Sequence, residues 1–425
     1  MITADLDAMG QRARLAAREL GFAGTKAKDR ALGLIAAALL ERQPELLAAN
    51  EADMRDGEAA GMSVALLDRL LLTPERLAGI AADVRSVAAL PDPVGEMFDV
   101  RTLPSGLTVG RKRVPLGVIA AIYESRPNVT IDIAALCLKS GNAVILRGGR
   151  EALRSCLALA EVLREVIGEA GLPQDAVQYV SDPDRSLVDH LLTMRDAIDL
   201  LVPRGGAELI RFVAERATMP VVTGGIGVCH TYVDAAADVE QAVRIAYNAK
   251  VRRPTICNAL DTLLVHRDIA AEYLPLLARE WAHADVAMHC DAEALAVLAP
   301  LQGEMALALS PAQEDDWGKE FLALVAAVKV IGSLDEALEH IARYGSGHSE
   351  AIVTEDYSHA MRFLNEVDAA AVYVNASTQF TDGAQFGLGA EVGISTQKFH
   401  ARGPMGLREL TSYKWLIFGQ GQVRP

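Results

Sequence analysis

The residue with the clearest chemical potential is Cys257, which stands in the segment KVRRPTICNAL. Three cations lie just upstream of it, Lys250, Arg252 and Arg253. Nearby positive charge lowers the pKa of a thiol from its usual value of about 8.5, and the resulting thiolate is what a nucleophile requires. The segment therefore allows two interpretations, a nucleophilic cysteine or a buried structural one.

The other four cysteines offer weaker chemistry. Cys137 and Cys156 fall on apolar faces of expected helices, where a cysteine packs as a small hydrophobic side chain. Cys229 precedes an expected strand and could line a site, whereas Cys290 stands beside His289 without further metal ligands. Because the five cysteines include no CxxC pair, we expect neither a disulfide framework nor a metal site.

Two glycine pairs flanked by arginine follow expected strands. Their residues are Arg147, Gly148, Gly149 and Arg150 in ILRGGRE, and Arg204, Gly205 and Gly206 in VPRGG. Glycine lets backbone N–H groups approach a phosphate, and the N-terminus of the following helix favours negative charge. Neither pair fits the GxGxxG fingerprint of dinucleotide-binding folds, so a nucleotide site and ordinary turn chemistry both stay open.

The elements that must position these residues begin with helices. Residues 5–90 follow helical periodicity, with breaks at Gly57 and Gly61 and a helix start at Thr73-Pro74. Residues 98–113 carry a Pro-Ser-Gly turn between alternating polar and apolar residues, which predicts a hairpin. Such a hairpin standing off the helices would suit contacts between subunits.

Short apolar runs then alternate with helical segments, and this alternation indicates a doubly wound parallel sheet. The expected elements are strands at 117–122, 143–146, 177–180 and 198–202 and helices at 128–139 and 151–167. A second α/β unit is expected from about residue 228. Its expected strands are 231–233, 262–265, 351–353 and 371–374.

Length and charge exclude several classes of protein. The length of 425 residues predicts two to three domains, and a composition of 51% hydrophobic and 23% charged residues predicts that they fold compactly. The net charge of −15 repels a phosphate backbone, so we expect no nucleic acid partner. The apolar stretches are shorter than the roughly 18–20 residues that cross a bilayer, so we expect no membrane partner. The opening MITADLDAMGQRARL lacks the apolar centre of an export signal, which favours a cytoplasmic protein.

Six segments of the chain carry a family resemblance. They are YESRPNVTIDIAALCLKSGNAVILRGG, VPRGG, GVCHTYVD, RRPTICNALDTLLVH, YGSGHSEAI and VYVNASTQFTDGAQFGLGAEVGISTQKFHARGPMGLRELTSYKW. Together they resemble the gamma-glutamyl phosphate reductases, also called glutamate-5-semialdehyde dehydrogenases, of the aldehyde dehydrogenase superfamily. The resemblance covers essentially the whole chain. It implies NADPH-dependent reduction of L-glutamyl 5-phosphate to L-glutamate 5-semialdehyde and phosphate, the second step of proline biosynthesis from glutamate.

The resemblance also implies roles for individual residues. Cys257 matches the nucleophile of the superfamily, and Asn128 matches the asparagine of its oxyanion hole. Glu320 matches the glutamate that holds the nicotinamide ribose, and both arginine-flanked glycine turns match cofactor-contacting turns. The Cys257 thiolate would attack the acyl phosphate to form a thioester, which hydride from the cofactor would reduce.

Two departures from relatives bear on the cofactor and on water. NAD-specific relatives tend to carry a glutamate at the place of Arg150, which here joins Arg147 in offering positive charge to the 2′-phosphate of NADP unless it points to solvent. Hydrolytic relatives carry a water-activating glutamate two residues before a Gly-Gly pair. Aligning that pair with Gly224 and Gly225 puts Val222 there, and a valine cannot act as a base. Unless that alignment slips, this disfavours the alternative of a hydrolytic NAD(P)-dependent aldehyde dehydrogenase.

Substrate contacts and assembly follow less directly. A substrate with a carboxylate and a phosphate needs cations, and the candidates, which could instead be interface or surface charges, are Arg126, Lys398, His400 and Arg402. A cofactor-binding protein without catalysis is a rival that the intact Cys257 and Asn128 disfavour. Because the reductase-like region uses all 425 residues, we expect no fused kinase, although the upstream glutamate 5-kinase is a candidate partner.

The resemblance finally implies a fold and a domain division. We expect an aldehyde-dehydrogenase-like α/β fold with two doubly wound domains and a small oligomerisation arm, assembled as a homo-oligomer. The expected parts are an NADP-binding domain at 1–97 and 114–225, a catalytic domain at 226–403, and the arm at 98–113 and 404–425.

Overall fold

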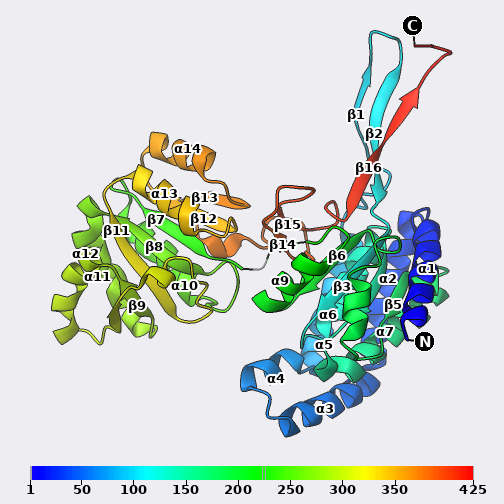
Figure 1. The fold of residues 1–425 in the computed structure, drawn as a ribbon, viewed down its shortest axis with the longest axis horizontal. Coiled ribbons are helices and arrows are strands. Elements are labelled where there is room, and N and C mark those ends of the chain that lie inside the picture. The colour runs from blue at the N-terminus through cyan, green and yellow to red at the C-terminus, as the bar shows by residue number, and fades with distance from the viewer. Residues whose placement is uncertain (1, 223, 225, 425) are drawn as a thin grey trace. The chain divides into compact units, whose positions relative to one another are not determined.

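The computed structural model describes residues 2–222, 224 and 226–424, which fall into two compact units (Figure 1). Unit 1 comprises Met1–Thr223, Gly387–Gly393 and Met405–Pro425, and unit 2 comprises Gly224–Phe386 and Ile394–Pro404. Each unit has its own parallel sheet. The stretch Gly387–Gly393 clusters with unit 1, although it lies inside the range 226–403. The functions assigned to the predicted domains stay predictions.

Unit 1 begins with the helical run that the periodicity predicts. Its helices are α1 (Ile2–Leu20), α2 (Thr25–Glu41), α3 (Gln43–Ala59), α4 (Val64–Leu70) and α5 (Pro74–Ala89). The helix start at Thr73 is confirmed, because its side chain accepts a hydrogen bond from Arg76 N at 3.2 Å. Gly61, with a φ of +72°, follows the end of α3 as predicted. The predicted break at Gly57 is wrong, since this residue lies inside α3 and a Cβ there would come 2.8 Å from Met62 Sδ.

The sheet of unit 1 confirms the doubly wound prediction. Its strands are β3 (Val118–Tyr123), β4 (Ala143–Arg147), β5 (Val177–Tyr179) and β6 (Leu200–Arg204), paired in parallel in the order β5-β4-β3-β6. The intervening and following helices are α6 (Asn128–Lys139), α7 (Leu153–Glu169), α8 (Ser186–Leu191) and α9 (Ala207–Arg216). Strand order reverses between β3 and β6, and doubly wound sheets bind ligands at the carboxyl ends beside such a reversal.

Unit 2 has a larger parallel sheet than the sequence predicts. Its order is β10 (Leu309–Pro311), β9 (Ala287–Cys290), β11 (Val325–Ile331), β8 (Leu260–His266), β7 (Cys229–Val233), β12 (Ser349–Val353) and β13 (Ala371–Val374). The four predicted strands are confirmed as β7, β8, β12 and β13, whereas β9, β10 and β11 were not predicted. β9 and β10 are too short to show a pattern, and the apolar run of β11 cannot be told from a buried helix by periodicity.

Helices connect the strands of unit 2 and cover its sheet (Figure 1). They are α10 (Val239–Val251), α11 (Arg267–His283), α12 (Ala292–Leu298), α13 (Leu334–Tyr344) and α14 (Tyr357–Glu366). A two-stranded ribbon of β14 (Ile394–Ser395) and β15 (Gly403–Pro404) belongs to the same unit. Among the described residues, no helix combines the length and apolar character that a membrane span needs.

An antiparallel arm extends from the helices of unit 1, in cyan and red in Figure 1. The predicted hairpin is confirmed as β1 (Met97–Thr102) and β2 (Thr108–Pro115), and β16 (Thr411–Phe418) pairs with β2 along its whole length. Arg111 on β2 lies over the rings of Tyr413 and Trp415, at 4.6 and 4.7 Å from their centroids. Ile417 and Phe418 are exposed. The role of this arm in oligomerisation stays a prediction.

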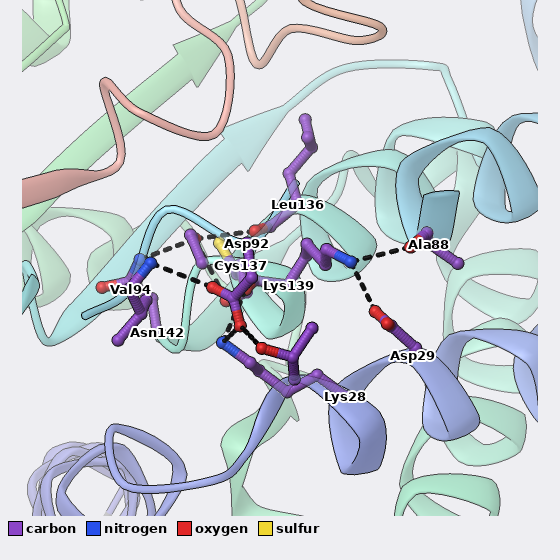
Figure 2. A network of polar contacts seen from close by, with 11 residues as sticks. Lys28, Asp29, Ala88, Asp92, Val94, Leu136, Cys137, Lys139 and Asn142 are labelled. Atoms are coloured by element: carbon purple, nitrogen blue, oxygen red, sulfur yellow. Dashed lines mark hydrogen bonds and ion pairs between the residues drawn. The ribbon is translucent and has the colours of Figure 1, made fainter. Parts of the chain in front are cut away.

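A network of two buried lysines and two aspartates lies where this arm begins (Figure 2). Lys28 of α2 places its Nζ 2.5 Å from Asp92 Oδ2 and donates to Lys139 O at 3.0 Å. Asp92 also accepts Val94 N at 3.0 Å, in the segment that leads into β1. Lys139, at the end of α6, pairs with Asp29 of α2. The network therefore joins α2, α6 and the segment that leads into the arm.

Candidate active site

The loop that carries Cys257 runs from the end of α10 to the start of β8 in unit 2. Cys257 is partly exposed, whereas the other four cysteines are buried. Its carbonyl oxygen accepts the Cys229 thiol at 3.3 Å. A Cβ at residue 227 would come 1.5 Å from the same oxygen, so only a glycine can occupy that position. The backbone of Cys257 is thus enclosed, whereas the residue as a whole is partly exposed to solvent.

Lys250 differs from the cation that the sequence argument assumed. It is fully buried, and its Nζ lies 3.4 Å from Asp261 Oδ1. Burial lowers the pKa of Lys250, partly offset by Asp261, and burial raises the pKa of Asp261 to about 6. Arg252 donates to Gln379 Oε1 at 3.1 Å. Lys250 is therefore paired with a carboxylate, which weakens its expected positive field on the thiol, whereas Arg252 contacts a neutral amide and keeps its charge.

Glu320 lies beside the same loop. Its Oε1 accepts the backbone N–H of Gly227 at 3.0 Å, and Gly227 packs against the carbonyl of Cys257. Burial raises the pKa of the half-buried Glu320, while the Gly227 hydrogen bond opposes that rise. The structure therefore brings together Cys257 and Glu320, two of the residues that the sequence selected.

Asn128 opens α6 in unit 1. Its Nδ2 donates to Asp132 Oδ2 at 2.8 Å, which uses one of the two amide protons and leaves the second for another acceptor. Burial raises the pKa of Asp132 to about 6, and the Asn128 hydrogen bond opposes that rise. The Asp132 contact orients the amide from within its own helix, one turn away.

The first glycine turn follows β4. Arg147 is half-buried and donates to two backbone carbonyls, Gly148 O at 3.0 Å and Pro183 O at 3.1 Å. Gly148 is buried, and a Cβ there would come 2.8 Å from the Tyr179 hydroxyl. Arg150 begins a short 3₁₀ turn and is exposed. The two arginines therefore differ, because Arg147 is held by carbonyls and Arg150 is presented to solvent.

A carboxylate also lies at this turn. Glu151 Oε1 accepts the backbone N–H of Ser125 at 2.7 Å and its hydroxyl at 2.6 Å. A Cβ on Gly149 would come 2.1 Å from the same oxygen. Glycine at this position thus lets Glu151 tie the turn after β4 to the end of β3.

The second glycine turn connects β6 to α9. Gly206 N donates to Glu124 Oε2 at 3.1 Å, and a Cβ on Gly205 would come 2.5 Å from that oxygen. Arg204 is half-buried and the two glycines are exposed. The start of α9 therefore accepts an anionic group, as the helix dipole favours.

The predicted substrate cations fall in different places. Lys398 and Arg402 in unit 2 both pair with Asp368, with Arg402 Nη1 2.6 Å from Asp368 Oδ1. These two cations lower the pKa of Asp368. His400 is exposed in the same segment, and Arg126 is exposed in unit 1. The structure therefore joins Lys398 and Arg402 through a shared carboxylate.

Val222 is buried in unit 1, with 4% of its surface exposed, and its N–H donates to Leu201 O at 2.8 Å. Of the Gly-Gly pair used for the alignment, Gly225 lies outside the described residues. A Cβ on Gly224 would come 1.9 Å from Ile394 O in unit 2. Over the described part of the chain, no cluster of three or more His, Cys, Asp or Glu side chains could hold a metal ion.

Several residues around Cys257 escaped the sequence argument. Asn258, Thr378 and Gln379 are buried and hydrogen-bonded to one another's segments, although they are far apart in the chain. Thr378 and Gln379 have one signal in the sequence, a group of polar residues, NASTQFTD, directly after the apolar run of β13, and Asn258 directly follows Cys257. Polar residues at the carboxyl end of a parallel strand are typical of a site.

Comparisons with known proteins agree with this arrangement. The sequence matches the aldehyde dehydrogenase family over residues 2–300 and 307–416. It is 61% identical to the gamma-glutamyl phosphate reductase of Dehalococcoides mccartyi, covering 99% of this chain and 98% of that one, and 57% identical to that of Roseiflexus castenholzii, covering 99% of each. The crystal structure of gamma-glutamyl phosphate reductase from Thermotoga maritima superposes with a TM-score of 0.96 at 45% identity, covering 99% of this chain and 100% of that one. The chain therefore belongs to the aldehyde dehydrogenase family and, within it, to the gamma-glutamyl phosphate reductases.

Proposed function

We propose that this protein reduces L-glutamyl 5-phosphate to L-glutamate 5-semialdehyde and phosphate with NADPH, the second step of proline biosynthesis from glutamate. The observation that carries the proposal is the 61% identity to a gamma-glutamyl phosphate reductase over nearly the whole of both chains. Cys257 is partly exposed, and Cys229 and Gly227 enclose its backbone carbonyl. Its thiol is a group suited to nucleophilic attack on an acyl phosphate.

Cys257 acts as the nucleophile in this proposal. Its thiolate attacks the acyl carbon of the substrate, and the carbonyl oxygen becomes an oxyanion that Asn128 and a backbone N–H near Cys257 stabilise. One such donor is typically worth about 2.7–4 kcal/mol in the transition state. The phosphate group then leaves with the electron pair of its bond to carbon, and a thioester remains on Cys257.

Residues of unit 1 fit a dinucleotide cofactor. The exposed Gly205 and Gly206 lie in the turn after β6, at the reversal of strand order, where the Gly206 N–H is bound to Glu124. Exposed Arg150 follows β4, on the other side of β3. When bound, the nicotinamide supplies the hydride that reduces the thioester. Arg147 and Arg150 would hold the 2′-phosphate of NADP, and Glu320 would hold the nicotinamide ribose.

Collapse of the resulting thiohemiacetal releases the aldehyde and returns the thiol. Val222 is apolar and buried, so it offers no base to activate water against the thioester. We therefore propose that phosphate, and not water, resolves the thioester in the reverse direction. A buried valine at this position therefore disfavours the hydrolytic alternative.

The first experiment measures oxidation of glutamate 5-semialdehyde with and without inorganic phosphate, using NADP or NAD. We expect activity that requires phosphate, prefers NADP and is lost in Cys257→Ala. Cys290→Ala, at a buried cysteine of β9 in the same unit, is the matched control and should keep its activity. Equal rates without phosphate would show that water resolves the thioester, and the hydrolytic alternative would replace this proposal.

A charge reversal tests the cofactor assignment separately. Arg150→Glu should reduce the preference for NADP over NAD at least about tenfold, because a carboxylate repels the 2′-phosphate. Arg18→Glu, at an exposed arginine of the last turn of α1, controls for the loss of positive charge. Cytoplasmic location, homo-oligomeric assembly and contact with glutamate 5-kinase stay predictions.

A further inference from the structure

The segment that follows β13 reaches the Cys257 loop on the side that precedes the cysteine. Gln379 Nε2 donates to Ala249 O at 3.0 Å and to Arg253 O at 3.2 Å. Its Oε1 accepts Arg252 Nη1 at 3.1 Å. One side chain therefore joins the last turn of α10 to the loop just ahead of Cys257.

The same segment also reaches the loop on the side that follows the cysteine. Asn258 Nδ2 donates to Thr381 O at 3.0 Å and to Gln379 O at 3.3 Å. In return, Thr378 Oγ1 donates to Asn258 O at 2.7 Å. Cys257 therefore lies between two groups of hydrogen bonds that come from one short stretch of chain.

This stretch is itself anchored in the sheet of unit 2. Thr381 Oγ1 shares short hydrogen bonds with Ser349 Oγ of β12, at 2.6 Å, and with Tyr373 OH of β13, at 2.7 Å. Thr378 is fully buried, and Gln379 and Asn258 expose 5% and 4% of their surface. Buried hydrogen bonds of this kind are costly to break, because the groups left behind have no water to pair with.

We propose that Thr378, Gln379 and Asn258 form a positioning clamp that sets the orientation of Cys257 for attack on an acyl group. Thr378 and Gln379 hold the loop that carries the thiol, Asn258 is the residue of that loop to which they bind, and all three are positioning residues. Attack requires the sulfur at a near-attack distance and angle, and a misplacement of about 1 Å can cost about 100-fold in rate. The clamp depends on the proposed function in one respect only, which is the identity of the acyl group that Cys257 attacks.

The test compares variants that remove single hydrogen bonds. Thr378→Val replaces the hydroxyl by a methyl group of similar size, and Thr378→Ser keeps the hydroxyl but removes the methyl group. Gln379→Ala removes all three side-chain contacts, and Gln379→Glu keeps an acceptor for Arg252 but loses both donors. For each we would measure kcat and KM of the oxidation, the rate of Cys257 alkylation by iodoacetamide as a function of pH, and the unfolding midpoint.

For Gln379→Ala we expect kcat to fall about 100-fold while KM stays within about threefold of its original value. The alkylation rate at pH 8 should change at least about fivefold, because the thiol no longer has a defined position. Thr378→Val should lower kcat about tenfold, whereas Thr378→Ser, which keeps the hydroxyl, should keep most of the wild-type kcat. If Gln379→Ala does not fold, the Thr378 pair decides the question.

Gln178→Ala in unit 1 is the matched control. Gln178 exposes 2% of its surface and also donates to two backbone carbonyls, Met9 O at 3.0 Å and Asp175 O at 3.2 Å. It should lose stability without a change in Cys257 alkylation. If the clamp variants show the same pattern as this control, the contacts only stabilise the fold and the proposal is overturned. Because alkylation needs no substrate, it judges the clamp even if the proposed reaction is not found.

Discussion

Lys28 in unit 1 and Lys250 in unit 2 are each buried beside an aspartate, and these two pairs are built differently. Lys28 lies 2.5 Å from Asp92 and has a second acceptor, the carbonyl of Lys139 at 3.0 Å (Figure 2). Lys250 lies 3.4 Å from Asp261, with its Nζ 5.9 Å from the ring centroid of Phe321. The first ammonium group is well paired, whereas the second is held loosely.

The aspartate of the first pair also accepts more hydrogen bonds than the aspartate of the second. Asp92 also accepts hydrogen bonds from Thr25 Oγ1 at 2.8 Å and from Val94 N at 3.0 Å. Asp261 has the N–H of Phe321 at 3.1 Å as its other donor, and burial raises its pKa to about 6. The pair that joins α2 to the segment before β1 is thus well satisfied, while the pair on the two elements flanking the Cys257 loop keeps a carboxyl group whose pKa burial raises to about 6.

The largest effect should follow from breaking the pair in unit 1. Lys28→Met should lower the free energy of unfolding by about 4 kcal/mol, because it leaves Asp92 buried without a cation. Urea unfolding measures the loss, and the double variant with Asp92→Asn should recover part of it. A loss below about 1 kcal/mol would mean that the Lys28 pair is no tighter than a surface pair.

The next effect is a pH dependence that belongs to unit 2. The folded-state pKa of Asp261, about 6, exceeds the usual unfolded value of about 3.9. Its contribution to stability is therefore complete below about pH 4 and is lost as pH rises through about 6. Between pH 4 and pH 7, the wild type should lose about 3 kcal/mol relative to Asp261→Asn, as measured by urea unfolding at each pH. A pH-independent difference would contradict the raised pKa.

The smallest effect should come from removing the lysine of the loose pair. Lys250→Met should cost about 1 kcal/mol at pH 7, because loss of the cation that lowers the pKa of Asp261 raises that pKa further above about 6 and lets the carboxyl group take up a proton. Unfolding measured beside Lys28→Met gives the direct comparison. If both variants cost the same, the contrast between the two pairs does not hold.

Local signals predicted much of this structure. α6 begins and ends at the expected residues, 128 and 139, and β13 occupies the expected residues 371–374. These elements were predictable because periodicity and turn residues act over a few positions of the chain. The three strands of unit 2 that escaped prediction are short or continuous with other apolar residues, so tertiary pairing and not local pattern makes them strands.

The candidate site shows the same division. Cys257 and its place in the family could be chosen from the sequence, since residue types and motifs carry that information. The partners of its loop could not, because Gln379 lies more than one hundred residues away and its hydrogen bonds exist only once β13 lies in the sheet. The sequence also presented Lys250 as a cation near the thiol, whereas the fold pairs it with Asp261.

By itself, the sequence determined the helices, most strands, the nucleophile candidate and the family. Each depends on residue identity at short spacing or on motifs that survive without coordinates. The tertiary structure alone decided which charges are paired, which glycines are required by a close approach, and what holds the Cys257 loop. The physical reason is that burial and hydrogen bonding depend on contacts between distant segments, and these contacts form only when the two sheets and their helices have folded.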